Sequence, residues 1–187
     1  MRLLSIRLLL IALMTFTTAC FASYMEVTLL GTGTPKPSIE RFGSATVVEV
    51  KGRYFLFDAG RGVTIRLQQA GIPLNRVEHI FLTHLHSDHI SGLSDLWLTS
   101  WIWQRPNAIK VTGPTGTKQL TTHLEQAYQA DYQYRSNNTG LTQSAFNLEH
   151  NEISEDTIVY QQDGIKISAF LVDHRPVKPA FGYKIES

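Results

Sequence analysis

The sequence predicts a single domain of the α+β class, with strands near both ends of the chain and helices between them. Short apolar runs bounded by glycine and proline turns occur near both ends, as is typical of strands. Between them, strand-like and helix-like segments alternate in the order β-α-β-α. With 187 residues, of which 43% are hydrophobic, the chain can bury one sizeable core but is short for two domains.

The first 22 residues have the pattern of an export signal. A basic start is followed by an apolar run from Leu8 to Phe16, which is shorter than the roughly 20 residues that span a bilayer. Thr17-Thr18-Ala19-Cys20 resembles a lipoprotein cleavage site, whereas cleavage after Ala22 is an equally good interpretation. We expect an exported domain over residues 23–187, either periplasmic or lipid-anchored through Cys20.

The predicted elements follow from the hydrophobic pattern and from the turn residues. Lys51-Gly52 has the composition of a two-residue β-hairpin turn, and Gly71 with Pro73 is a usual helix stop. The polar segment over 131–150 is interpreted as a surface insertion or lid. In order, we expect strands over 25–30, 44–50 and 53–58, a helix over 63–69, a strand over 79–82, a helix over 93–104, a strand over 109–111, a helix over 118–130, and strands over 157–160, 165–172 and 181–185.

The most informative segment is Thr83-His84-Leu85-His86-Ser87-Asp88-His89, directly after an apolar strand. Imidazole nitrogen and carboxylate oxygen are the donors that zinc and similar divalent ions accept. Alternate side chains of an extended loop point the same way, so His84 and His86 can grip one ion, while Asp88 and His89 project toward a neighbouring position. The spacing indicates two metal ions, and a histidine-rich surface turn is the competing interpretation.

These residues resemble the metallo-β-lactamase superfamily, and within it the ribonuclease Z and arylsulfatase-like branch. The resemblance implies an αββα sandwich, in which two sheets pack face to face with helices outside. Family members of this type usually continue into a second β-rich half that supplies a bridging aspartate and a final histidine, so we expect an incomplete sandwich. The matching segments are Leu30 to Pro35, Arg41 to Ser44, Phe57 to Gly60, Thr83 to His89 with Gly92-Leu93, Gly113 to Thr117, Val172 to His174 and Phe181 to Glu186.

By this resemblance, His84 and His86 match ligands of a first metal ion, and Asp88 and His89 match ligands of a second. His174 matches the histidine that completes the first site. Asp88 is also the catalytic candidate, because it would orient the nucleophile. The expected cofactor is one or two Zn²⁺ ions, with Mn²⁺ as an alternative. Without a bridging carboxylate, the second ion should bind weakly.

The resemblance implies an exported zinc-dependent hydrolase that uses metal-activated water on a phosphodiester, a sulfate ester or a similar small-molecule ester. The alternative is an inactive or weakly metal-binding remnant of such an enzyme. A net charge of +1 with interspersed charges, together with the export signal, disfavours nucleic acid as a partner. Membrane contact is expected only through lipidation of Cys20, and uncovered sheet surface would favour a homo-oligomer.

Several further residues have a structural interpretation beside a functional one. Asp58 matches a position that supports the metal loop, by which we mean the segment from Thr83 to His89. It could equally be a turn residue that ends a strand. Trp97 and Trp101 are four apart on a predicted helix and are expected to pack into the core. The histidines outside the motifs, which are His79, His123 and His150, are expected to face solvent or pack in the core.

Overall fold

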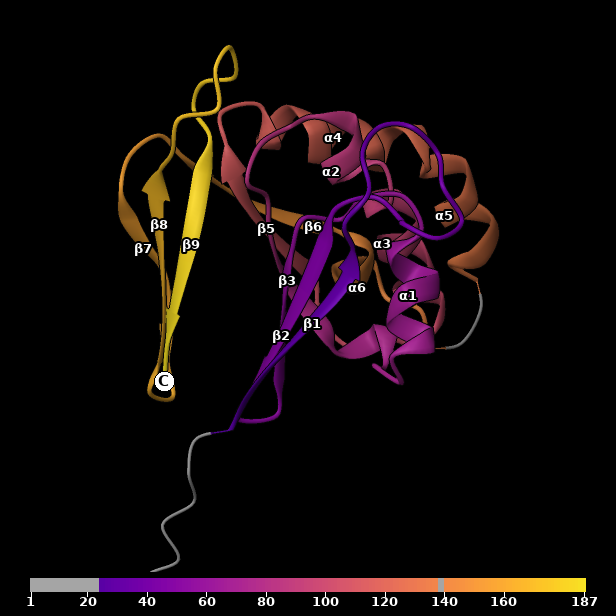
Figure 1. Ribbon diagram of the computed structural model, residues 1–187. Coiled ribbons are helices and arrows are strands. Elements are labelled where there is room, and N and C mark those ends of the chain that lie inside the picture. The colour runs from indigo at the N-terminus through magenta and orange to yellow at the C-terminus, as the bar shows by residue number, and fades with distance from the viewer. Residues whose placement is uncertain (1–23, 138–139) are drawn as a thin grey trace, which may run out of the picture.

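The computed structural model describes residues 24–137 and 140–187. The predicted export signal, with Cys20 and both cleavage positions, lies outside these residues. Two β-sheets pack face to face, and helices lie against the outer face of the larger sheet (Figure 1). The predicted α+β class with stacked sheets is therefore confirmed. Over the described residues the layers run helix, sheet, sheet, which is the αββα arrangement with one helical layer.

The larger sheet has six strands in the order of the sequence. The first three strands are antiparallel, and the third to the sixth are parallel. Because parallel strands end at the same edge of a sheet, the segments after them meet at one rim. The strands are β1 (Met25–Gly31), β2 (Ala45–Val50), β3 (Arg53–Phe57), β4 (Val77–Phe81), β5 (Ile109–Pro114) and β6 (Leu148–Ile153).

The smaller sheet is a three-stranded antiparallel meander of β7 (Thr157–Gln162), β8 (Ile165–Leu171) and β9 (Phe181–Glu186). The hairpin turn predicted at Lys51-Gly52 is confirmed, and a second turn of the same kind joins β7 and β8. Lys51 and Gly52 have φ values of 50° and 73°, and Asp163 and Gly164 have 51° and 71°. Two successive residues with positive φ are typical of the type I′ turn, whose twist matches that of the strands it joins.

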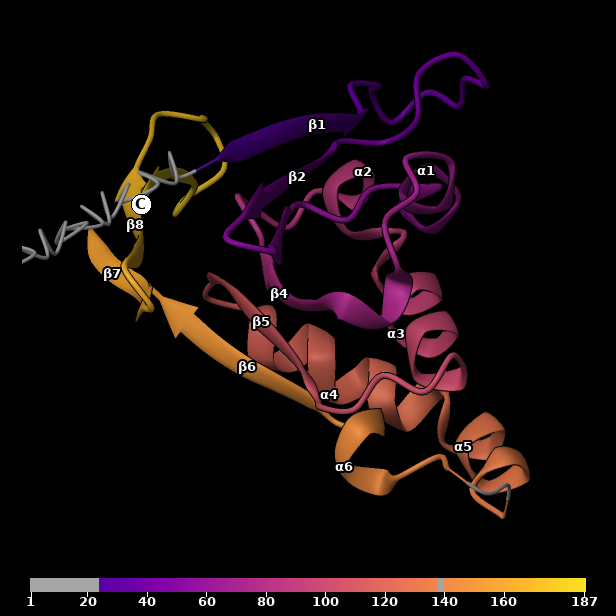
Figure 2. The same cartoon turned by 90° about the horizontal axis from the view of Figure 1, so that it is seen from below.

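The helices on the outer face bury the aromatic residues that the sequence assigned to the core. Trp97 and Trp101 are fully buried, and their Nε1 atoms donate to the carbonyl oxygens of Phe146 and Thr142. Figure 2 shows these helices along one side of the larger sheet. Among the described residues, no helix has the length and apolar character needed to cross a bilayer. The helices are α1 (Val63–Gln69), the 3₁₀ turn η1 (Leu74–Arg76), α2 (Ser87–Ile90), α3 (Leu93–Ile102), α4 (Thr117–Ala127), α5 (Gln129–Arg135) and α6 (Gln143–Phe146).

His79 is half-buried and packs against aromatic residues of both sheets. Its ring centroid lies 5.7 Å from that of Phe55 on β3 and 5.0 Å from that of Tyr160 on β7. His123 and His150 are exposed. The expectation that these three histidines are core-packed or solvent-facing is therefore confirmed.

The interpretation of 131–150 as a surface insertion or lid is wrong at the end of the segment, from Ala145 on. The segment contains the end of α5, the short α6 and the start of β6, the edge strand of the larger sheet. Phe146 and Leu148 are buried, whereas the four residues from Glu149 to Glu152 are exposed. Because β6 lies at an edge and exposes its middle, its sequence lacks the apolar pattern by which strands are recognised.

Candidate metal centre

Three of the five predicted ligands converge at the rim where β4 ends. One side-chain nitrogen from each of His84, His86 and His174 lies within 4.8 Å of the other two. Nε2 of His84 is 3.0 Å from Nδ1 of His86, and the ring centroids of His84 and His174 are 4.5 Å apart. His84 is buried, while the other two histidines are exposed. Three imidazoles open to solvent on one side suit a divalent metal ion with a free coordination position.

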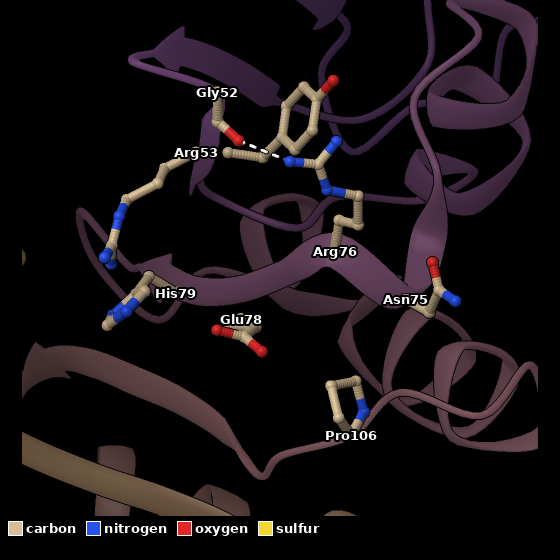
Figure 3. A pocket seen from close by; sticks show the side chains of 8 residues that line it. Gly52, Arg53, Asn75, Arg76, Glu78, His79 and Pro106 are labelled. Carbon is tan, nitrogen blue, oxygen red and sulfur yellow. Dashed lines mark hydrogen bonds between the residues drawn. The ribbon is translucent and has the colours of Figure 1, made fainter.

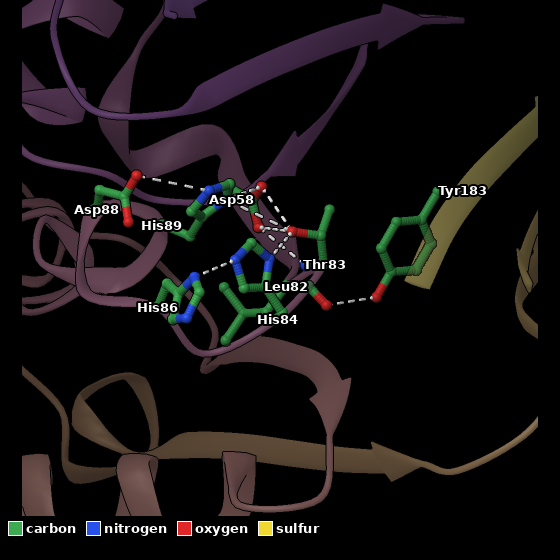
Figure 4. A network of polar contacts seen from close by, with 8 residues as sticks. All are labelled: Asp58, Leu82, Thr83, His84, His86, Asp88, His89 and Tyr183. Atoms are coloured by element: carbon green, nitrogen blue, oxygen red, sulfur yellow. Dashed lines mark hydrogen bonds and ion pairs between the residues drawn. The ribbon is translucent and has the colours of Figure 1, made fainter. Parts of the chain in front are cut away.

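Asp58 is buried next to the histidine cluster and contacts Thr83 and His89 of the metal loop. It directly follows β3, is 4% exposed and has a φ of 60°, an uncommon conformation that aspartate tolerates better than most residues. Its Oδ1 accepts a hydrogen bond of 2.8 Å from the backbone N–H of Thr83, and its Oδ2 lies 2.6 Å from Nδ1 of His89 (Figure 4). Asp58 therefore supports the metal loop, in addition to ending a strand.

Thr83 extends this support to His84. Its hydroxyl lies 2.9 Å from Oδ2 of Asp58 and 2.9 Å from Nδ1 of His84. Because a carboxylate only accepts, the hydroxyl donates to Asp58 and is left to accept a hydrogen bond from the Nδ1–H of His84. Such an arrangement leaves Nε2 of His84 unprotonated, which is the form that binds a metal ion.

Asp88 and His89 lie beside the cluster of three histidines, on α2. Nε2 of His89 is 3.7 Å from Oδ2 of Asp88, and the ring centroids of His84 and His89 are 4.1 Å apart. Since Nδ1 of His89 faces Asp58, its Nε2 is directed toward Asp88 (Figure 4). All five predicted residues therefore lie at one rim, in a group of three and an adjacent pair.

The charges of the rim follow from its burial and its neighbours. Burial, with the positive fields of His89 and His174, lowers the pKa of His84 to about 4, so that its imidazole is neutral at pH 7. Burial also acts to lower the pKa of His89, but the hydrogen bond and charge of Asp58, assisted by Asp88, outweigh it and raise that pKa. The rim thus combines a neutral imidazole with an imidazole that is paired with a carboxylate.

The smaller sheet brings His174 to the rim. The backbone N–H of Phe181, the first residue of β9, donates to the carbonyl oxygen of Thr83 at 2.9 Å. Two residues further on, the hydroxyl of Tyr183 donates to the carbonyl oxygen of Leu82 at 2.8 Å (Figure 4). Both bonds fix the loop before β9, which carries His174, against the metal loop.

Thr83 and Tyr183 were not singled out from the sequence as supporting residues. The sequence signal for Thr83 is its place beside the first histidine of the motif. Tyr183 carries no comparable signal, because its partner is a backbone carbonyl 101 residues away in the chain.

Comparison with known families identifies the relationship. The sequence model described as Anti-Pycsar protein Apyc1 matches residues 25–187, which is nearly all of the described chain. The chain belongs to this family. Ribonuclease Z from Mycobacterium sp. (strain KMS) is 39% identical over 165 residues, which cover 87% of this chain and 57% of that protein. The chain thus spans little more than half the length of this curated relative.

Solved structures agree on the fold. Human tRNase Z, short form (ELAC1), is 26% identical with a TM-score of 0.69, over 85% of this chain and 64% of that one. The metallo-β-lactamase fold protein YhfI from Bacillus subtilis has a TM-score of 0.64 at 17% identity, over 86% and 58% of the two chains. The resemblance to the metallo-β-lactamase superfamily and to ribonuclease Z is confirmed, whereas its arylsulfatase-like part stays a prediction.

One expectation about partners loses its support. Charge distribution and the export signal disfavoured nucleic acid, but the name of the mycobacterial relatives, ribonuclease Z, gives RNA as what those proteins act on. The expectation that nucleic acid is unlikely as a partner is therefore not supported by these relatives.

Proposed function

We propose that His84, His86 and His174 bind a divalent metal ion, with Zn²⁺ as the favoured ion and Mn²⁺ as the alternative. The observation that carries this proposal is the convergence of their three nitrogens within 4.8 Å. The donor set fits the ion, because neutral imidazole is a preferred zinc ligand and the Thr83 contact leaves Nε2 of His84 free to coordinate. Asp88 and His89 are the proposed ligands of a second, more weakly held ion.

We further propose that the chain is a metal-dependent hydrolase. When bound, the metal ion would acidify a coordinated water and stabilise negative charge on the attacked group. Asp88 lies at the rim with its carboxylate 3.7 Å from His89, where it can accept a proton from the attacking water and orient it. Contacts with Thr83 and with each other hold His84 and His86 in position. The metal ion and its bound water would therefore be held in a fixed orientation toward the substrate.

The substrate we propose is an ester: a phosphodiester first, then a sulfate ester or a related small ester. The ribonuclease Z relatives support a phosphodiester, because RNA itself is one. A panel of a chromogenic phosphodiester, a sulfate ester, a lactone, a β-lactam and a precursor transfer RNA separates these classes. Hydrolysis of the sulfate ester alone would overturn the phosphodiester proposal.

The decisive experiment compares the chain with its His86→Ala variant in the presence of zinc or manganese. We expect chelation to remove both activity and bound metal, and the variant to lose both at unchanged thermal stability. His123→Ala is a matched control, since His123 is an exposed histidine on α4, outside the proposed ligand set. Activity that survives in His86→Ala would contradict the proposal.

A second candidate function is metal binding without turnover. Among the described residues, one cluster alone brings three metal-ligating side chains together, and Asp88 and His89 form only a pair beside it. A single tightly held zinc per chain with no hydrolysis across the panel would favour this candidate. Two tightly held zincs per chain with turnover would favour the hydrolase.

Export and assembly remain proposals of their own. We propose that residues 1–22 direct export and that Cys20 either is lipidated or is removed with the signal. Cell fractionation with labelled palmitate, comparing the chain with Cys20→Ser, distinguishes these outcomes.

We also propose a homo-oligomer, because Val27 and Leu29 on β1 are 58% and 62% exposed. Light scattering coupled to size-exclusion chromatography tests this proposal.

A further inference from the structure

A cavity lies where β3 and β4 begin, at the opposite ends of these strands from the histidine cluster. It has a volume of about 450 Å³, which is within the size range of small-molecule sites. The proposed metal ligands follow the last residues of the same two strands. The two sites therefore lie at opposite ends of β3 and β4. The residues that matter for its chemistry are Arg53, Tyr54, Asn75, Arg76, Glu78 and His79 (Figure 3).

An irregularity in the sheet directs Glu78 to this cavity. The parallel pairing of β3 and β4 passes from Tyr54 opposite Val77 to Phe55 opposite His79, so Glu78 has no partner on β3. Such bulges are rare in parallel pairs, and they commonly redirect a side chain. Oε1 of Glu78 accepts a hydrogen bond of 2.8 Å from Nδ2 of Asn107. The carboxylate is thereby fixed in position with further capacity to accept hydrogen bonds.

Two arginines line the same cavity as Glu78. Arg76 donates to the carbonyl oxygen of Gly52 at 2.6 Å and lies 5.2 Å from the ring centroid of Tyr54. Arg53 donates to the hydroxyl of Tyr160 and forms an ion pair of 2.5 Å with Asp163. A guanidinium has five N–H donors, and these contacts use one of those of Arg76 and two of those of Arg53. Both groups are therefore held in place with donors to spare.

A third arginine, Arg105, precedes the cavity-lining Pro106 in the chain and lies within the electrostatic field of Glu78. Arg105 is 2% exposed, and its Nε and Nη1 donate to Ser100 and to the carbonyl oxygen of Asn107. Its Nη2 is buried without a hydrogen-bond partner among the described residues. Burial lowers the pKa of Arg105 to about 10, so it is still charged at pH 7. Arg53 is paired with Asp163, whereas no carboxylate among the described residues lies within ion-pair distance of Arg76, so Arg76 is the guanidinium most available to an anion.

We propose that this cavity binds a small anionic ligand that also carries a hydrogen-bond donor. A phosphate or carboxylate group of the ligand would contact Arg76 and Arg53, and its N–H or O–H donor would contact Glu78. The rings of Tyr54 and His79 provide flat surfaces beside these groups. The proposal is independent of metal binding, because none of the proposed metal ligands lines the cavity.

Isothermal titration of the full chain tests this proposal with three probes. Cytidine 5′-monophosphate offers a phosphate and an amine, L-glutamate offers carboxylates and an ammonium group, and inorganic phosphate offers an anion of minimal size. We expect saturable binding of the nucleotide or of glutamate with a Kd of about 1 mM or below, and weaker binding of phosphate. Which of the two binds identifies the anionic group. Absence of saturation by either organic probe up to roughly 10 mM would overturn the proposal.

Variants locate the binding. Arg76→Gln and Glu78→Gln should each weaken binding about tenfold or more, because each removes a charge-assisted hydrogen bond. Arg135→Gln removes a positive charge on α5, outside the cavity, and should leave binding unchanged. His86→Ala should also leave it unchanged, which separates this site from the metal rim. Equal binding by all four variants would show that the probes bind elsewhere, and thermal denaturation checks that each variant is folded.

Discussion

The two ends of β3 and β4 carry different chemistry on the same pair of strands. At the end of the strands, Asp58 and the histidines of the metal loop form a network of short contacts that points imidazole nitrogens at one position. At the beginning, Arg53, Arg76 and Glu78 present charged groups around a cavity. At the histidine end, four of the five proposed ligands come from the six residues His84 to His89, whereas the arginine end depends on a bulge and on residues from three separate segments. One sheet can therefore position a local motif and a dispersed one.

The largest expected effect is at the histidine end. His174→Ala removes one of three proposed ligands, so zinc affinity should fall by roughly 100-fold or more, since even loss of a supporting contact costs about 10- to 100-fold. Competition with a chromogenic chelator measures the zinc Kd. Affinity for cytidine 5′-monophosphate should not change. A variant that retains the parent zinc affinity would show that His174 is not a ligand.

The next effect concerns the support beneath the ligands. Asp58→Asn keeps the shape of the side chain but replaces one accepting oxygen by a donor, which disturbs the contacts with Thr83 and His89. We expect zinc affinity to fall by about 10- to 100-fold with the fold retained. Asp95→Asn, on the exposed side of α3, is a matched control. Parent-like zinc affinity in Asp58→Asn would contradict the supporting role.

A pH effect is expected from His79, which links the arginine end to the core. Burial, with the positive charge of Lys110, lowers its pKa from 6.5 to about 4, against the opposing field of Glu78. Between these two pH values the unfolded chain binds more protons, so stability falls as the pH drops from about 6.5 to 4 and then levels off. The loss should be on the order of 2 kcal/mol after allowance for partial exposure.

Denaturant unfolding of the chain and of His79→Phe across this pH range measures the effect. Phenylalanine suits the aromatic surroundings of Phe55, Phe81 and Tyr160 and does not titrate. The difference in stability between the two proteins should therefore change over this interval. Parallel pH profiles would show that His79 does not contribute.

The smallest effect is expected where the second sheet meets the metal loop. Tyr183→Phe removes the hydrogen bond to the carbonyl oxygen of Leu82 and should cost about 1 kcal/mol of stability. Zinc affinity should fall only a few-fold, since Phe181 still holds Thr83. Tyr134→Phe, at an exposed tyrosine of α5, should be neutral. A neutral Tyr183→Phe would show that the sheets stay together without this bond.

Elements with a strong local pattern were predicted well. The helix over 63–69 and the hairpin turn at Lys51-Gly52 agree with the structure, because apolar spacing and turn residues specify them locally. The helix predicted over 118–130 is divided near Tyr128 into α4 and α5. Edge strand β6 was missed because a strand that exposes its middle has no need of alternating apolar residues.

By itself, the sequence determined the order of most elements and which donors lie together in the metal loop, because neighbours along the chain stay neighbours after folding. Only the tertiary structure decided how His174 reaches that loop, since a hydrogen bond from Phe181 to Thr83 joins segments almost a hundred residues apart. It likewise decided that Asp58 contacts both Thr83 and His89, and that Glu78 joins two arginines at a cavity. Such contacts depend on strand register and sheet packing, which arise from the whole chain and leave no local pattern.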